Sequence, residues 1–253
     1  DEKAKIITSI AMFYDLENPN KFVDDISKIL HPDGIWILEL SYLPLMLSQN
    51  AFDTIVHEHL EYYHLDALEF LLSKFDLKVG DIQLNDINGG SFRVVVQHKE
   101  KSFDNKSLEH ITELREKEKN LSLHTNQPFD DFIKKINDEK NNLVTFIKNE
   151  VSAGKTIHCY GASTKGNTLL QFYNLDKKLI QFIADRNPDK WGRRTIGTDI
   201  SIISEEESHS MNPDYFLILP WHFIKEFKER EKDYLKNGGR LLVPLPQFKV
   251  IEA

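Results

Sequence analysis

Histidines, carboxylates and phenols crowd into residues 57–64 of the chain. An imidazole can act as a general base near neutral pH, and a carboxylate such as Glu58 can orient the ring or raise its basicity. His57 and His59 would share one face of an extended strand, so they are also candidate metal ligands, although a catalytic zinc needs a third protein ligand. A polar surface loop without chemistry fits the same residues. The segment therefore predicts a base, a metal site or a surface loop.

A second candidate site is the glycine turn within residues 85–93. Asn88 is followed by Gly89 and Gly90, and the segment ends at Arg93. Paired glycines allow the backbone to come close to a ligand, and an arginine can hold a phosphate or a carboxylate. The same pattern is typical of a hairpin turn with a solvated arginine, so both interpretations stay open.

A third candidate site occupies residues 160–166, between a predicted strand and a predicted helix. Gly161, Ser163, Thr164 and Lys165 lie in this turn. Backbone amides at the start of a helix, together with hydroxyl and ammonium groups, suit a phosphate. The turn therefore predicts a phosphate contact.

Asp185 adds a second interpretation of this turn, a dinucleotide site. It follows Gly161 by 24 residues, at the end of the next predicted strand, where a dinucleotide-binding fold places the acid that binds the ribose. Against it, Cys159 stands where the first glycine of a G-x-G turn is expected. Lys165 also precedes Gly166 instead of following it, so there is no Walker pattern. An NAD-dependent oxidoreductase remains an alternative, which titration with NAD would test.

The elements expected to position these residues begin with a βαβ unit. Residues 6–10 are apolar and mostly β-branched and predict a buried strand, and Asn18-Pro19 predicts the start of a helix. Residues 32–34 predict a turn and residues 35–40 a second strand. This order is typical of a right-handed βαβ unit in a parallel sheet.

A helix, a hairpin and a second α/β unit are expected to follow. Residues 65–75 predict a helix, and two predicted strands at residues 77–84 and 91–97 are joined across the glycine turn. Residues 101–150 predict one or two amphipathic connecting helices, or a solvated coiled-coil arm. Further strands are predicted at residues 156–160, 179–184, 215–219 and 240–243, with a helix between residues 221 and 236. The predicted fold class is therefore α/β.

Composition limits the classes of partner. The chain has 253 residues and a net charge of −8, so we expect it to bind neither nucleic acid nor an anionic membrane. Its one cysteine excludes an intrachain disulfide and a cysteine zinc site within the chain. No apolar run reaches the ~20 residues that cross a bilayer, and no signal-peptide core is present, so we expect a cytoplasmic protein.

Five segments together resemble the family of sugar C-methyltransferases in deoxysugar biosynthesis. Their order and spacing are more specific than any one of them, and they extend over nearly the whole chain. The segments are residues 52–63, 88–93, 160–167, 184–188 and 219–222.

The resemblance implies a protein of three parts: an N-terminal zinc domain, a middle domain that binds S-adenosylmethionine, and a C-terminal domain that helps to bind a nucleotide-linked deoxysugar. The middle and C-terminal domains would both be Rossmann-like. Residues 1–100 would be the C-terminal portion of the methyltransferase domain, residues 101–150 a helical connector, and residues 151–253 the Rossmann-like, sugar-nucleotide-binding domain. The donor loop and the zinc cysteines would precede Asp1. We therefore expect an incomplete donor site, zinc only outside this chain, and no metal ligand within it.

The resemblance also implies a mechanism. The ketone of a nucleotide-linked 4-keto deoxysugar would acidify the C3 proton, and by motif position His59 would remove it, with Glu58 beside it. The enolate carbon would then attack the donor methyl group. Some members carry a tyrosine at the position of Val56, and some carry a histidine near Tyr14, so the oxyanion partner is left open.

The remaining expected roles are those of substrate contacts. His57, Tyr62 and Tyr63 are candidate oxyanion partners, and Trp221 and His222 follow a predicted strand end, the usual ligand edge of an α/β sheet. A nucleotide-sugar-binding module without catalysis, or a subunit that needs a partner chain or a missing N-terminal segment, is the alternative function. The expected substrate-binding residues are Tyr62, Tyr63, Asn88, Gly89, Arg93, Gly161, Ser163, Thr164, Lys165 and Asp185.

Overall fold

The computed structural model describes residues 2–102 and 104–253, without the side chain of Asn88. The chain folds as two compact α/β units. The first comprises Asp1–Ser48 and His57–Asp130, and the second comprises Gln49–Val56 and Asp131–Ala253. A short segment of the N-terminal half thus belongs to the second unit.

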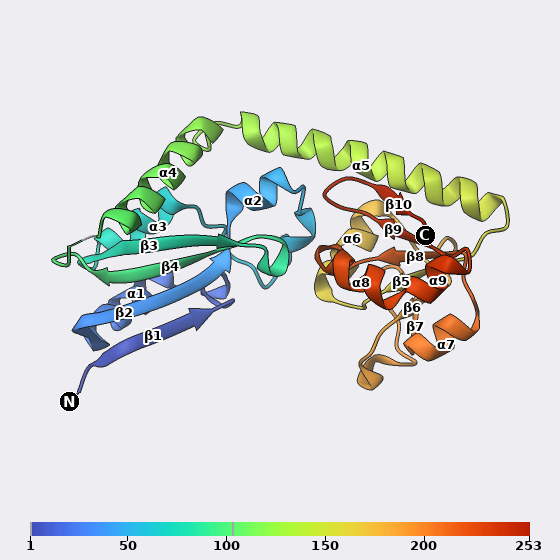
Figure 1. Cartoon of the computed structure of the whole chain (residues 1–253), viewed down its shortest axis with the longest axis horizontal. Helices are drawn as coiled ribbons and strands as arrows, with labels where there is room; N and C mark the ends of the chain where they lie inside the picture. Colours follow the sequence, from blue (N-terminus) through green and yellow to red (C-terminus); the bar gives the residue numbers. More distant parts are fainter. Residues whose placement is uncertain (1, 103) are drawn as a thin grey trace. The chain divides into compact units, whose positions relative to one another are not determined.

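A mixed sheet forms the centre of the first unit (Figure 1). β1 runs parallel to β2, and β4 is antiparallel to both β2 and β3, so the predicted βαβ unit and the predicted hairpin are confirmed. The strands, in their order across the sheet, are β1 (Ala4–Ile10), β2 (Leu30–Ser41), β4 (Ser91–His98) and β3 (Leu77–Asn85).

The helix α1 (Pro19–Ile29) connects β1 to β2 and begins where the sequence predicts. The side-chain oxygen of Asn18 accepts a hydrogen bond from the backbone amide of Lys21 at 3.0 Å. Pro19 occupies the first turn, where its missing N–H costs nothing. The cap and the proline together fix the start of the helix.

The turn predicted at residues 32–34 is wrong, because these residues lie within β2. The register between the first two strands shifts here: Ala4 pairs with Leu30, but Ile6 pairs with Ile35. A bulge therefore absorbs the extra residues and lets the strand continue. A Cβ added at Gly34 would lie 2.8 Å from the carbonyl oxygen of Ala4, so the close approach of the strands requires glycine.

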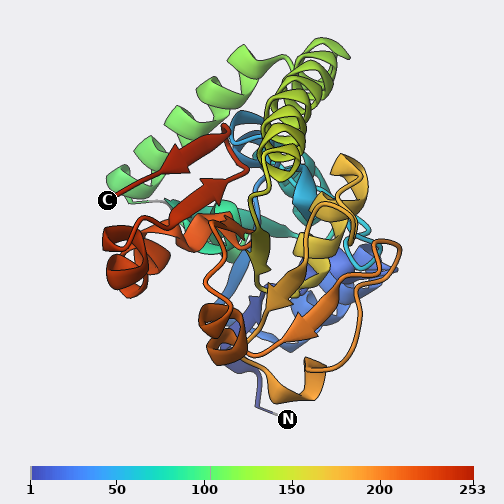
Figure 2. The same ribbon diagram turned by 90° about the vertical axis from the view of Figure 1, so that its right-hand side faces the viewer.

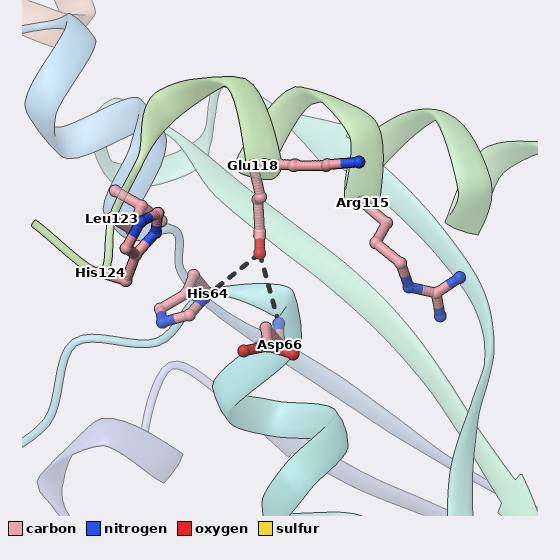
Figure 3. Close-up of a pocket in the computed structure, with 7 residues that line it drawn as sticks. His64, Asp66, Arg115, Glu118, Leu123 and His124 are labelled. Atoms are coloured by element: carbon pink, nitrogen blue, oxygen red, sulfur yellow. Dashed lines mark hydrogen bonds and ion pairs between the residues drawn. The ribbon is translucent and has the colours of Figure 1, made fainter.

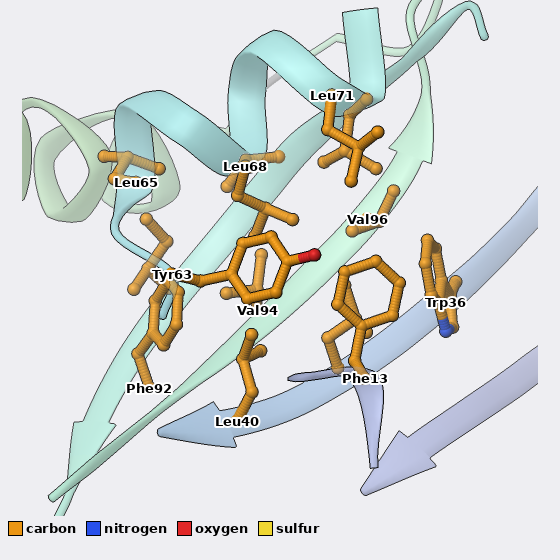
Figure 4. Packing of buried hydrophobic residues seen from close by; sticks show 14 of the residues in the cluster. Phe13, Trp36, Leu40, Tyr63, Leu65, Leu68, Leu71, Phe92, Val94 and Val96 are labelled. Atoms are coloured by element: carbon orange, nitrogen blue, oxygen red, sulfur yellow. The ribbon is translucent and has the colours of Figure 1, made fainter. Parts of the chain in front are cut away.

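The core of the first unit lies between the sheet and its helices. Trp36, Leu38 and Leu40 alternate along β2 and are all buried, as a strand with one covered face requires. Figure 4 shows Leu68 and Leu71 of α3 facing the valines of β4. The helices that contribute to this core are α1, α3 (Leu65–Ser73) and α4 (Asn105–Leu121), and a short α2 (Leu43–Ser48) follows β2.

The second unit contains a mostly parallel sheet, seen in Figure 2. The chain moves from β5 to β6 on one side of the sheet and later returns to β8 on the other side. Only β10 is antiparallel, at the edge beside β9. The order across the sheet is β10 (Lys249–Ile251), β9 (Arg240–Val243), β8 (Tyr215–Ile218), β5 (Ile157–Tyr160), β6 (Phe182–Ala184) and β7 (Ser201–Ile203).

Five helices accompany this sheet within the described residues of the second unit, the first of them beginning just before the unit boundary. The connecting helices predicted within residues 101–150 are present as α4 and α5. Among the described helices, none combines the length and the apolarity needed to cross a membrane. The helices are α5 (Gln127–Ser152), α6 (Thr164–Tyr173), α7 (Glu205–Ser210), α8 (Ile224–Arg230) and α9 (Lys232–Lys236).

Candidate functional site

The carboxyl edge of the first unit's sheet gathers several candidate residues. β1 and β2 are parallel, so their ends at Ile10 and Ser41 meet at one edge. β4 is antiparallel to β2 and begins at Ser91, opposite Ser41, and β3 ends at Asn85 beside it. Ligands of open α/β sheets bind at this kind of edge.

His59 lies against a tyrosine that follows β1. The ring centroids of Tyr14 and His59 are 4.4 Å apart, with 57° between the planes. The backbone carbonyl of Tyr14 accepts hydrogen bonds from the amides of Leu60 and Glu61, at 2.9 and 3.1 Å. Tyr14 therefore holds both the imidazole and the backbone that follows it.

The phenol of Tyr14 stays protonated at neutral pH. Burial raises its pKa above the ordinary value of 10.0, and the negative charge of Asp15 raises it further, against the effect of a hydrogen bond with Ser41. A neutral phenol offers an O–H donor. The edge therefore combines an imidazole with a neutral hydroxyl.

The other two predicted catalytic residues lie on the surface. The side chain of His57 is 87% exposed, and its Nδ1 lies 3.3 Å from a carboxylate oxygen of Glu58. Contacts between exposed polar side chains of this kind contribute little to stability. The structure leaves this pair accessible to solvent, and its catalytic role remains a prediction.

The two tyrosines that follow His59 differ in environment. Tyr63 is buried in the core, where its ring lies 5.2 Å from that of Phe13 (Figure 4). Tyr62 is only partly buried, and burial raises the pKa of its phenol. The structure thus makes Tyr63 a core residue, and Tyr62 is the better placed of the two for a ligand.

Glu118 of α4 fixes the C-terminal end of this segment, as Figure 3 shows. Its carboxylate accepts hydrogen bonds from the hydroxyl of Tyr42 at 2.8 Å and from the amide of Leu65 at 2.6 Å. It also lies 3.2 Å from Nδ1 of His64 and accepts a bond from the amide of Asp66 at 3.3 Å. The carboxylate therefore caps the start of α3 and borders a cavity of about 420 Å³.

The glycine turn between β3 and β4 has the backbone that its sequence predicts. Gly89 and Gly90 have φ angles of 88° and 119°, which favour glycine. Arg93 is paired within the sheet, because its guanidinium lies 2.6 Å from a carboxylate oxygen of Glu39. Its predicted contact with a ligand anion would have to compete with Glu39. The side chain of Asn88 lies outside the described residues.

The turn after β5 is tightly built in the second unit. Gly161 has a φ of 83°, and a Cβ added there would lie 3.0 Å from the ring of Pro220. Ser163 caps α6, because its Oγ accepts a hydrogen bond from the amide of Gly166 at 3.0 Å. Thr164 is exposed at the first position of the helix. The predicted turn from strand to helix is therefore confirmed.

Asp185 organises this turn from the end of β6. Its Oδ2 accepts a hydrogen bond from the amide of Ala162 at 2.7 Å and lies 3.2 Å from Nζ of Lys190. Its Oδ1 accepts a hydrogen bond from the amide of Asn187 at 2.8 Å. The carboxylate is thus held in a fixed orientation at the carboxyl edge.

A buried carboxylate from the N-terminal half belongs to this unit. Asp53 is 1% exposed, and its Oδ2 accepts a hydrogen bond from the indole of Trp221 at 2.9 Å. Burial raises the pKa of Asp53 and lowers that of Lys165, although each charge favours the other. Phe52 packs on Phe172, with ring centroids 4.7 Å apart. These contacts fix the segment Gln49–Val56 on the second unit.

The comparison with known families decides the identity of the chain. Residues 86–246, more than half of the 253, match the family described as the C-methyltransferase C-terminal domain. The chain belongs to this C-methyltransferase family. The match begins in the glycine turn of the first unit and ends after β9, so it includes the turn after β5 and the Trp221 strand end.

The family assignment agrees with one curated relative. The C-methyltransferase NovU of Streptomyces niveus is 32% identical over 250 residues, which are 99% of this chain. The chain spans 59% of the length of that relative. Similarity along nearly the whole chain confirms the resemblance to C-methyltransferases drawn from the five sequence segments.

Two solved structures match part of this chain. A chain of the complex that contains the Haloferax volcanii Trm112 methyltransferase activator is 13% identical, covers 41% of this chain and 57% of that chain, and has a TM-score of 0.34. LepI in its complex with SAM is 12% identical, covers 38% of this chain and 27% of that chain, and has a TM-score of 0.33.

Tyr14 and Asp53 of this C-methyltransferase chain were given no role from the sequence, but in the structure each contacts a candidate site residue. Tyr14 contacts His59 from 45 positions away, and Asp53 meets Trp221 across 168 positions. Neither pair follows a local period that sequence patterns could detect. Within the described residues, no group of three or more histidines, cysteines or carboxylates is arranged to hold a metal ion.

Proposed function

We propose that this chain supplies the proton-removing residue and nucleotide contacts of an S-adenosylmethionine-dependent C-methyltransferase that acts on a nucleotide-linked ketosugar. The observation that carries the proposal is the position of His59, whose ring contacts that of Tyr14 at the carboxyl edge of a parallel strand pair. Membership of the C-methyltransferase family supports the reaction class.

Removal of a proton next to a ketone is the step that this chain would perform. The imidazole of His59 accepts the proton from the carbon beside the carbonyl, and the C–H electron pair becomes the enolate. The enolate carbon would then take the methyl group that S-adenosylmethionine supplies when bound, and the electron pair of the broken carbon–sulfur bond would stay on sulfur. The proton leaves His59 to solvent, which resets the base.

A hydrogen-bond donor for the enolate oxygen is needed in this scheme, because charge develops there. The candidate donors are the phenol of Tyr14, whose ring contacts that of His59, and the partly buried phenol of Tyr62, three residues after His59, because burial raises the pKa of both. Their raised pKa values let them donate a proton in a hydrogen bond without losing it. We assign the oxyanion role to this pair of phenols.

The methyl donor is assigned to no residue of the described chain. S-adenosylmethionine supplies an electrophilic methyl group when bound. The turn after β1 holds no glycine in residues 11–15, and two of its amides are already used: that of Ala11 bonds to the carbonyl of Glu39 and that of Asp15 bonds to the carbonyl of Met12. This turn does not fit the donor, so the chain's own side chains are assigned only the removal of the proton and the contact with the enolate oxygen.

Methyl transfer by the complete gene product that contains this chain tests the proposal. Radiolabelled S-adenosylmethionine and a panel of dTDP-linked 4-keto-6-deoxysugars are the probes. We expect transfer with at least one sugar and a loss of about 10²- to 10⁴-fold in kcat for His59→Gln. His124→Gln, an exposed histidine after α4, is the matched control and should keep full activity.

Two results would contradict the proposal. Unchanged transfer by the His59→Gln variant would remove the base assignment. Binding of a nucleoside diphosphate without transfer to any ketosugar would instead favour the alternative of a nucleotide-sugar-binding module.

A further inference from the structure

The backbone that follows His59 is held in place at both of its ends. The carbonyl oxygen of Tyr14 accepts hydrogen bonds from the first two amides of residues 60–64. Near the other end, the amide of Leu43 donates to the carbonyl oxygen of Tyr63 at 2.9 Å. Both contacts come from parts of the first unit that precede His59 in the chain, so the path of residues 60–64 is fixed from outside the segment.

Tyr42 connects the second of these contacts to the glycine turn. It follows β2 and forms a parallel bridge with Tyr63. Its amide donates to the carbonyl oxygen of Gly90 at 3.3 Å, and its ring packs on that of Phe92, with centroids 4.7 Å apart. Tyr42 is only 2% exposed and closely packed, so a movement of its side chain would be transmitted to the backbone near Tyr63.

Glu118 of α4 joins Tyr42 to the end of the same segment through a single oxygen atom. Its Oε1 accepts hydrogen bonds from the hydroxyl of Tyr42 at 2.8 Å and from the amide of Leu65 at 2.6 Å. Its Oε2 reaches His64 and the amide of Asp66, as Figure 3 shows. Hydrogen bonds to a charged carboxylate are stronger than those between neutral groups. Glu118 therefore holds the end of β2 and the start of α3 in one arrangement.

The helix α4 also packs on the first unit through apolar side chains. Ile111 and Leu114 are 2% and 4% exposed, about two turns and one turn before Glu118. A buried charge is a weak source of stability compared with a well-packed apolar side chain, because the charge must leave water. Glu118 is nevertheless only 7% exposed. The donors that converge on it from two elements indicate that it fixes the positions of those elements.

We propose that Glu118 is a positioning residue, which sets the place of the His59 imidazole through the hydroxyl of Tyr42 and the amide of Leu65. The inference deepens the proposed function and rests on it, because His59 is the base that Glu118 would position. Glu118 acts through the backbone of residues 60–64 and is assigned no contact with the substrate. A small displacement of a base removes much of its rate, so the loss of Glu118 slows proton removal.

Steady-state methyl transfer by the complete gene product separates positioning from folding. Glu118→Gln keeps one acceptor oxygen but loses the charge and the second acceptor. Rates are measured at a temperature where circular dichroism shows each variant to be folded. We expect kcat of Glu118→Gln to fall about ten-fold or more, with KM within about two-fold of the wild type. Glu116→Gln, exposed on the same helix, is the matched control and should keep both constants.

A double variant tests whether Glu118 acts through His59. If Glu118 only positions the imidazole, its substitution has nothing left to disturb once the imidazole is gone. We therefore expect His59→Gln and the double variant His59→Gln/Glu118→Gln to transfer methyl groups at the same residual rate. A further loss in the double variant, as large as that of Glu118→Gln alone, would show that Glu118 acts independently of His59.

The position of His59 can also be measured without methyl transfer, by NMR of the complete gene product with isotopically labelled histidine. The signal that is missing from His59→Gln belongs to His59. Its frequency depends on the ring current of Tyr14, whose ring lies 4.4 Å away between centroids. We expect Glu118→Gln to shift this signal and Glu116→Gln to leave it unchanged. Tyr42→Phe removes one hydroxyl from the same contacts and should also shift it, so it replaces Glu118→Gln if that variant does not fold.

The possible outcomes separate this inference from the proposed function. An unchanged His59 signal in both Glu118→Gln and Tyr42→Phe, or additive losses in the double variant, would overturn the positioning role and leave the base assignment intact. A shifted His59 signal together with unchanged methyl transfer by His59→Gln would do the reverse, because Glu118 would position a residue that is not the base.

Discussion

The carbonyl oxygen of Tyr14 accepts hydrogen bonds from the two amides after His59, and the Tyr14 ring lies 4.4 Å from the imidazole, centroid to centroid. One residue of the turn after β1 thus orients the candidate base from two directions. Orientation matters because a base displaced by about 1 Å can lose much of its rate.

The ring of Tyr14 contacts His59, and its hydroxyl is a proposed oxyanion donor. Two substitutions of Tyr14 should therefore have different effects on kcat. Tyr14→Ala removes the ring beneath His59 and should lower kcat by about 10²-fold or more. Tyr14→Phe keeps the ring but removes the hydroxyl, so its loss reports the oxyanion role alone. Steady-state methyl transfer by both variants measures the two contributions. Equal activity of Tyr14→Ala and the wild type would remove Tyr14 from the site.

Glu118 should contribute to the stability of the first unit. Glu118→Gln removes the charge that accepts bonds from Tyr42, His64 and the start of α3, and should lower the free energy of unfolding by about 1–3 kcal/mol. Glu116→Gln, exposed on the same helix, should change it by less than about 0.5 kcal/mol. Urea denaturation at pH 7 measures both, and equal stabilities of the two variants would contradict the role of Glu118.

The carboxylate of Glu118 should also make the stability of the fold depend on pH in the acidic range. Burial tends to raise the pKa of Glu118, but the hydrogen bonds from His64, Leu65 and Tyr42 outweigh it and leave the pKa below the ordinary value of 4.5. A carboxylate with a lowered pKa stabilises the fold above that value and stops doing so as the pH falls through the folded pKa. Denaturation between pH 6 and pH 3 should show this loss in the wild type and a smaller one in Glu118→Gln.

Asp53 in the second unit is expected to have the opposite effect from Glu118: its ionisation should make the fold less stable. Burial raises its pKa above the ordinary value of 3.8, so the stability of the fold decreases as the pH rises from 3.8 through the folded pKa. Asp53→Asn keeps an acceptor for the indole of Trp221 and should be at least as stable as the wild type at pH 7. Asp53→Ala leaves that buried N–H without its acceptor and should cost about 1–3 kcal/mol. Thermal unfolding ranks the three proteins, and a less stable Asp53→Asn would contradict the argument.

His209 should make the stability of the fold depend on pH near neutrality. Its hydrogen bond to the buried Glu231 raises the pKa above the ordinary value of 6.5, although burial opposes this. The charged pair stabilises the fold fully below pH 6.5 and stops doing so as the pH rises through the folded pKa. The melting temperature of the wild type should fall relative to that of His209→Gln between pH 6 and pH 9. Parallel curves would show that the pair contributes nothing.

Much of the fold follows from local patterns that the structure bears out. Apolar strands, the cap at Asn18, the glycines at positions 89 and 90 and the cap at Ser163 each specify a backbone state within a few residues. The strands β7 and β10 are too short, at three residues each, to show a period. The turn predicted at residues 32–34 failed because a bulge admits turn-forming residues inside a strand.

The candidate site was only partly predictable for a physical reason. The residue types of a site are local, but its contacts join distant parts of the chain. The sequence placed His59 in a reactive cluster, but the ring that contacts it belongs to Tyr14, which follows another element of the fold. It also gave no sign that Arg93 pairs with Glu39, because that pairing depends on the register between β2 and β4.

Exchange of the substrate's own proton is the most direct test of His59 as the base. The complete gene product is incubated in D₂O with a dTDP-linked 4-keto-6-deoxysugar and without S-adenosylmethionine, and NMR follows the signal of the hydrogen next to the ketone. The account predicts that the wild type exchanges this hydrogen for deuterium well above the rate in buffer, and that His59→Gln exchanges it about 10²-fold more slowly. Exchange at the same rate in both proteins would contradict it.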